Sequence, residues 1–105
     1  MKKIGLCGLL AVCLSSTALA DVSIGGGNVL RIGSQGDVAY FGLDAGMGTC
    51  AFGIIYIDSV TSSDVAARNR AVALLTAAYL AGRRVSRVDY AQTSDGSCHA
   101  KLVEF

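Results

Sequence analysis

The residues best suited to chemistry lie close together near the C-terminus, where Asp95, Ser97, Cys98 and His99 occur in one short stretch. Aspartate, serine and histidine could form a hydrolytic triad. Residues at alternate positions of one loop are not expected to converge, however, and the chain has no G-x-S-x-G nucleophile turn. The pattern favours a surface histidine on an edge strand. No carboxylate pair for glycosidic hydrolysis is evident either, so we expect no enzyme activity.

The four cysteines divide into two pairs with different expected fates. Cys7 and Cys13 lie in the apolar N-terminal segment, whereas Cys50 and Cys98 lie in the rest of the chain. In an oxidising compartment a lone pair of cysteines indicates a disulfide. A metal site would need more ligands than the single histidine offers, so we expect no metal or other cofactor. The bridge would close a loop of 48 residues (98 − 50) and contribute about 3–4 kcal/mol of stability.

The first twenty residues, MKKIGLCGLLAVCLSSTALA, have the three parts of a secretory signal peptide. Two lysines precede a short apolar run, which ends in the cleavage signal Ala18-Leu19-Ala20. A lipoprotein signal ending at Cys13 is the alternative, but Val12 stands where a small residue is expected. Cleavage after Ala20 would remove twenty of the 105 residues and leave a single domain of 85, Asp21 to Phe105, in the periplasm or outside the cell.

The charge balance argues against a nucleic-acid partner. Loss of Lys2 and Lys3 reduces the 9 basic residues to 7, against 8 acidic ones, so the exported chain carries a net charge of −1. Arg83, Arg84 and Arg87 form the one basic cluster. We interpret it as a solvated corner, because a groove for single strands would need a wider basic surface.

Turn residues divide the exported chain into five strand-like segments and one helix. The segment Asp21–Gly27 is expected to be a flexible lead-in, because it ends in three glycines. Strands rich in β-branched and aromatic residues are predicted at Asn28–Ile32, Val38–Leu43, Cys50–Asp58, Val85–Tyr90 and Cys98–Phe105. Gly36, in the turn between the first two, suits a positive φ in a hairpin.

The helix is predicted from Ser63 to Ala81, with N-cap candidates at Thr61, Ser62 and Ser63 and with Gly82 as its C-terminal stop. It therefore lies between the third and fourth strands. Five antiparallel strands with one helix at that position are typical of the OB-fold, a small Greek-key barrel. We expect a mainly β domain of this class.

The helix carries more apolar side chains than one buried stripe requires. The stripe predicted to face the barrel comprises Ala67, Ala71, Leu74, Leu75, Ala78 and Tyr79. Val72, Ala73, Ala77 and Leu80 lie outside its centre and are candidates for an interface between subunits. Helix propensity alone could also explain the alanines, so self-association and a monomer both remain open.

Several of these segments together resemble one protein family. The helix end shows Leu75, Ala78, Tyr79 and Gly82, followed by Val85, and Tyr-Ile-Asp occurs at positions 56–58. With Cys50, Cys98 and the Val38–Phe41 segment, this pattern resembles the pentameric B subunits of bacterial AB-type toxins. Those of subtilase cytotoxin and of the pertussis-like and typhoid-like toxins, and their small stand-alone relatives, are the most similar.

The resemblance implies an OB-fold, a ring of five subunits, an enzymatic A subunit docked on that ring, and binding of host-surface glycans. By the same resemblance, Ser23, Asn28 and Tyr90 are the candidate glycan-binding residues, although glycines replace the hydroxyl usual near the first strand. The alternative is a periplasmic OB-fold protein with an accessory or structural role and no sugar binding.

Overall fold

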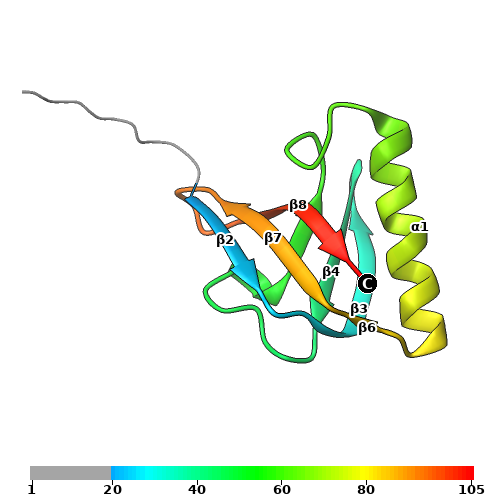
Figure 1. Cartoon of the computed structure of the whole chain (residues 1–105). Helices are drawn as coiled ribbons and strands as arrows, with labels where there is room; N and C mark the ends of the chain where they lie inside the picture. The colour runs from blue at the N-terminus through cyan, green and yellow to red at the C-terminus, as the bar shows by residue number, and fades with distance from the viewer. Residues whose placement is uncertain (1–19) are drawn as a thin grey trace, which may run out of the picture.

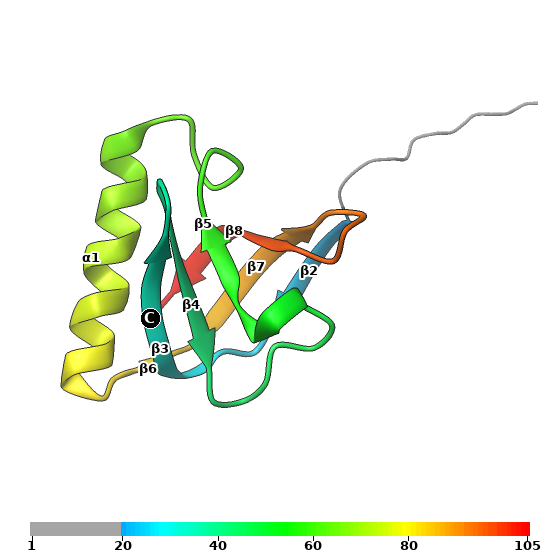
Figure 2. The same cartoon turned by 180° about the vertical axis from the view of Figure 1, so that it is seen from behind.

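A computed structural model describes residues 20–105, so the predicted signal peptide lies, except for Ala20, outside the described part of the chain. The domain is mainly β with one helix. Seven strands form one sheet in the order β2-β7-β8-β5-β4-β3-β6 (Figures 1 and 2). The elements are β2 (Ala20–Ile24), β3 (Gly27–Gln35), β4 (Val38–Leu43), the 3₁₀ turn η3 (Ala51–Gly53), β5 (Ile55–Ile57), α1 (Val65–Ala81), β6 (Arg84–Val85), β7 (Arg87–Gln92) and β8 (Cys98–Glu104).

The predicted hairpin between the first two strands is confirmed. β3 and β4 pair antiparallel from Gln35↔Val38 to Val29↔Leu43, and Gly36 adopts the positive φ of 59° that the turn requires. A β-bulge between Val29 and Arg31 inserts Leu30 as an extra residue. Because a bulge reverses the alternation of side chains, Ile32 packs against the core while Arg31 lies on the outer face.

The prediction of a flexible lead-in is wrong. Residues 20–24 form β2, which pairs antiparallel with β7 from Ala20↔Gln92 to Ile24↔Val88. Val22 and Ile24 are partly buried against the core, and this burial fixes the strand. Gly26, which follows this strand, has a structural role, since a Cβ there would lie 2.1 Å from the carbonyl oxygen of Val85. Glycine is needed for the close passage of two backbones rather than for flexibility.

The third predicted strand, Cys50–Asp58, is also wrong in most of its length. Only Ile55–Ile57 is a strand, because Phe52 and Gly53 adopt φ values of 60° and 65° that extended backbone cannot have. The fourth predicted strand is interrupted at Ser86, which separates β6 from β7. Because β2 precedes the three predicted strands, the helix follows four strands of the described chain rather than three.

Helix α1 begins later than predicted and lies against β3 and β5 (Figure 1). Its N-cap is Asp64, whose carboxylate accepts a 3.0 Å hydrogen bond from the backbone N–H of Ala66, whereas Thr61, Ser62 and Ser63 precede it. Gly82 ends the helix with a left-handed φ of 66°, as predicted. Among the described residues, no helix has the length and hydropathy needed to span a membrane.

The core is wholly apolar over the described residues and lies between the inner face of the sheet and α1. It is centred on Phe41, Ile55, Leu75, Val85 and Val88, all of which have no exposed surface. The predicted Cys50–Cys98 disulfide is confirmed, with the two Cα atoms 5.5 Å apart. It attaches the loop before η3 to the start of β8.

Candidate functional site

The three residues suggested for glycan binding do not line one common site. Tyr90 is only 3% exposed and belongs to the core, so it offers a ligand almost no surface. The register pairs Ser23 with Asp89 and Val22 with Tyr90, which places Ser23 on the opposite face from Tyr90. Asn28 donates hydrogen bonds of 2.9 and 3.1 Å from its backbone and side chain to the carboxylate of Asp44. We therefore do not place a binding site at these residues.

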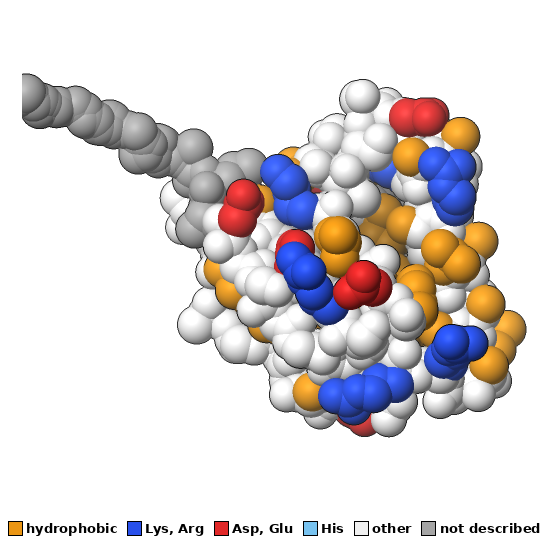
Figure 3. Space-filling model, viewed as in Figure 1, with side chains coloured by type: hydrophobic (Ala, Val, Ile, Leu, Met, Phe, Trp, Pro, Cys, Tyr) orange, Lys and Arg blue, Asp and Glu red, His pale blue; other side chains and the backbone are white. Residues whose placement is uncertain are grey.

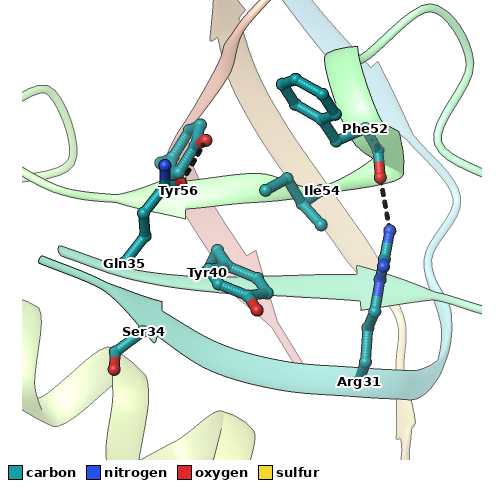
Figure 4. A pocket seen from close by; sticks show the side chains of 7 residues that line it. All are labelled: Arg31, Ser34, Gln35, Tyr40, Phe52, Ile54 and Tyr56. Carbon is teal, nitrogen blue, oxygen red and sulfur yellow. Dashed lines mark hydrogen bonds between the residues drawn. The ribbon is translucent and has the colours of Figure 1, made fainter.

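A hollow on the outer face of β3, β4 and β5 is the strongest candidate site (Figure 4). Its volume is about 320 Å³, which falls within the range of small-molecule sites. Seven side chains line it: Arg31, Ser34, Gln35, Tyr40, Phe52, Ile54 and Tyr56. We call this hollow the tyrosine groove, because Tyr40 and Tyr56 both line it.

Strand register brings the two tyrosines together. Tyr40 and Tyr56 are cross-strand partners on β4 and β5, with ring centroids 6.4 Å apart and planes at 78°. Such an edge-to-face pair is a favourable aromatic arrangement. Gly33, the partner of Tyr40 on β3, makes room for it, since a Cβ there would lie 2.7 Å from the Tyr40 hydroxyl. The Tyr56 hydroxyl donates a 2.8 Å hydrogen bond to the side-chain oxygen of Gln35.

Arg31 forms the cationic end of the tyrosine groove (Figure 4). Its guanidinium donates to the carbonyl oxygens of Phe52 and Gly53. It reaches them by crossing Gly42, its partner on β4, where a Cβ would lie 3.2 Å from Arg31 Nε. The salt bridges found among residues 20–105 do not include Arg31. An anionic group of a ligand could therefore take the role of a carboxylate partner here.

Phe52 stands at the edge of the groove in an unfavourable backbone conformation. It is the one non-glycine residue with a positive φ in the described part of the chain, and 83% of its surface is exposed. Left-handed φ values disfavour residues with a Cβ, and strain of this kind is concentrated at functional sites. A strained and exposed aromatic ring beside two tyrosines suggests a contact surface for a ligand.

The position of the single histidine differs from the predicted one. His99 lies on β8, an interior strand between β7 and β5, and its side chain is only 15% exposed, so the expected surface position on an edge strand is wrong. Its Nδ1 atom lies 2.7 Å from Oδ2 of Asp58. Asp58 also accepts a 3.0 Å bond from the backbone N–H of Val60, as expected of a turn residue. Long-range pairing of this kind leaves no signal in sequence spacing.

The turn that leads to His99 is held by Asp95. Hydrogen bonds from the Thr93 hydroxyl and from Ser97 lower the pKa of Asp95 from its ordinary 3.8 to about 2. This carboxylate therefore orders the turn, and it is not positioned as the third member of a triad. Over residues 20–105 no three histidine, cysteine or acidic side chains gather as metal ligands.

The predicted subunit-interface residues divide into two groups. Val72 is partly buried against the core, so only part of its side chain could contact a partner subunit. Ala73, Ala77 and Leu80 are exposed, and Leu80 shows 78% of its surface. The buried side of the helix is narrower than the predicted stripe. Leu75 and Ala78 are buried, whereas Leu74 and Tyr79 are 51% and 45% exposed.

Comparisons with known proteins give no relative. No family model matches the chain, and neither a curated protein nor a solved structure matches it significantly.

Proposed function

We propose that this protein is an exported, non-enzymatic binding module that recognises acidic glycans through the tyrosine groove and assembles into a ring through α1. In this proposal it resembles the B subunits of AB-type toxins, and an enzymatic A subunit docks on the ring. The observation that carries the proposal is the tyrosine groove itself, in which aromatic faces, an amide and an arginine line one open hollow of about 320 Å³.

The composition of the groove suits a sugar. Pyranose rings have an apolar face that packs on aromatic side chains, and their hydroxyl groups are complementary to amide and phenol groups such as those of Gln35 and Tyr56. Arg31 adds a fixed cation, which suits a sugar carboxylate in a bidentate arrangement. An acidic sugar is therefore complementary to the aromatic, hydrogen-bonding and cationic groups of the groove.

The strand order supports an OB-like barrel as the scaffold. β6 and β7 are separated by Ser86 alone, and they pair with β3 and with β8 respectively. Taken as one interrupted strand, they connect the β3 edge of the sheet to its β8 side. β5 and β8 pair in parallel, and the other strand pairs are antiparallel. Without β2, these strands correspond to a five-stranded Greek-key barrel of the OB type.

The outer surface of α1 supports assembly. Four large apolar side chains of this helix are 45–78% exposed: Val65, Leu74, Tyr79 and Leu80. Apolar side chains also gather along the helix and beside it in Figure 3. At about 100° per residue Leu74 lies on the opposite side of the helix from Val65, so these side chains are spread round the exposed surface of α1 rather than along one strip. Large exposed apolar surfaces mark interaction sites. We assign this surface, called here the outer helix face, to contacts between copies of the chain.

Binding to immobilised sialyllactose, an acidic trisaccharide, tests the proposal. Arg31→Gln should weaken binding of the oxidised protein by about tenfold or more, since a lost hydrogen bond to a charged group is worth about 1.5–3 kcal/mol. Arg83→Gln removes an exposed arginine outside the groove and serves as the control. Equal binding of the two variants contradicts the groove assignment. Absence of binding by the wild-type protein favours the accessory or structural alternative.

A further inference from the structure

We propose that the tyrosine groove continues beyond Tyr56 into a second binding hollow at His99 and Asp58, so that the ligand is an oligosaccharide of at least two sugar units. This inference rests on the proposed glycan binding and deepens it. The second hollow has a volume of about 350 Å³ and is lined by Gln35, Val38, Tyr56, Asp58, Ser97 and His99. We call it the histidine hollow.

The two hollows are adjacent because they share a wall. Tyr56 and Gln35 line both of them, and the 2.8 Å hydrogen bond between these side chains fixes the wall in place. A ligand in the tyrosine groove that extends past Tyr56 therefore enters the histidine hollow directly.

Strand register places three aromatic rings in a row that passes through the shared wall. Tyr40 pairs with Tyr56 between β4 and β5, and Tyr56 pairs with His99 between β5 and β8. The Tyr56 and His99 rings lie 5.8 Å apart and only 32° from parallel. Because neighbouring strands are about 4.8 Å apart, the row from Tyr40 to His99 extends about 10 Å across three strands. A single sugar ring is too short to contact the whole row.

The histidine is oriented for hydrogen bonding at the far end of this row. Asp58 engages Nδ1 through Oδ2 and is itself held at Oδ1 by the Val60 backbone. Nε2 is the ring nitrogen left for a ligand hydroxyl. Because a carboxylate fixes one nitrogen, the ring orientation is set before any ligand arrives. Asp95 also interacts electrostatically with this histidine, and its carboxylate is engaged by Thr93 and Ser97.

The chemistry of the two hollows differs, and this difference defines the class of ligand. Arg31 provides a cation at one end of the tyrosine groove, whereas the histidine hollow presents an imidazole and the Ser97 side chain beside an aspartate. The first suits an acidic unit. The second repels a further carboxylate through Asp58 and suits a neutral, hydroxyl-rich unit. The expected ligand is thus an acidic sugar linked to a neutral one.

The test uses the single histidine of the chain as a reporter in the unmutated protein. Imidazole NMR signals of His99 are recorded at constant pH during titration with sialyllactose and, separately, with the methyl glycoside of N-acetylneuraminic acid. We expect sialyllactose to shift the His99 signals with the same dissociation constant as its binding curve. The methyl glycoside should bind in an Arg31-dependent manner and leave the His99 signals unmoved.

A variant gives an independent measurement. His99→Ala should weaken binding of sialyllactose about tenfold and leave binding of the methyl glycoside unchanged, with near-UV circular dichroism confirming the fold. Binding of sialyllactose without any shift of the His99 signals overturns the inference and leaves the proposed function intact. Equal weakening of both glycans by His99→Ala also overturns it. If neither glycan binds the wild-type protein, the proposed function itself fails.

Discussion

At the scale of single residues, the tyrosine groove depends on two glycines that never contact a ligand in our proposal. Gly33 lies beneath Tyr40, and Gly42 lies beneath Arg31, each as the cross-strand partner. The absence of a Cβ at these positions lets the two long side chains lie across the strands instead of projecting from the sheet. The shape of the groove is therefore determined as much by its glycines as by its aromatic rings.

We predict that Gly33→Ala weakens glycan binding and changes stability by less than about 1 kcal/mol. The new methyl group would lie 2.7 Å from the Tyr40 hydroxyl, so the ring must move, and it can do so because this hydroxyl is the far end of a flexible side chain. Calorimetric titration with sialyllactose and thermal unfolding measure the two effects. Gly25→Ala, where nothing lies within 4 Å, is the control, and equal binding by the two variants would refute the prediction.

The sequence alone does not show which residues form the tyrosine groove, and the reason is structural. Arg31 faces outward because the bulge at Leu30 reverses the alternation of β3, and a bulge leaves no dependable pattern in the residues around it. The segment Val38–Leu43 gave no such signal either, because it is apolar throughout and its burial does not alternate, with Val38–Tyr40 half-buried and Phe41–Leu43 buried. Tyr90 was assigned to the ligand although the register turns it into the core.

At the scale of elements, the helix and the hairpin were predictable because local chemistry specifies them. Gly36 and Gly82 have the positive φ values that their turn and helix stop require. β2 is not predicted because its stability comes from pairing with β7, 64 to 72 residues away along the chain, which no local propensity encodes. The extent of β5 was overestimated for a similar reason, since an apolar run says little about the turn at Phe52.

The outer helix face leads to a prediction about assembly. Leu80→Glu should convert the oligomer into monomers, because a carboxylate would replace a side chain that is 78% exposed in the single chain and buried between subunits in our proposal. Folding should be retained, since glutamate and leucine have similar helix propensities. Light scattering on a sizing column measures the mass, with five copies expected for the wild-type protein.

The matched control is Leu30→Glu, which introduces the same charge at a leucine that is 63% exposed on β3. This variant should keep the mass of the wild-type protein. A wild-type monomer, or an unchanged mass for Leu80→Glu, would show that the apolar residues of α1 reflect helix propensity and not assembly.

At the scale of the whole molecule, the disulfide compensates for small size. A domain this short buries a limited share of its surface, so one covalent link provides a large fraction of its stability. Cys50 and Cys98 are 7% and 0% exposed and belong to the core, and the bridge joins the loop before η3 to β8. It therefore connects the segment that carries Phe52 with the strand that carries His99.

We predict that reduction of the disulfide lowers the free energy of unfolding by about 3–4 kcal/mol, because the unfolded chain gains the entropy of an open loop. The bridged cysteines are separated by 48 positions. Urea unfolding with and without a thiol reductant measures the change. The double variant Cys50→Ala/Cys98→Ala should be as unstable as the reduced protein and should not respond to the reductant. A response of that variant would point to another cause.

The left-handed backbone at Phe52 creates a conflict between two selective pressures. Glycine or asparagine would relieve the strain at a φ of 60°, and neither would expose a large apolar ring to solvent. Mutation and selection for heat resistance alone would therefore drive position 52 away from phenylalanine. Selection for capture of a glycan would retain an aromatic residue there. The amino acid at this one position thus records which of the two demands the molecule has had to satisfy.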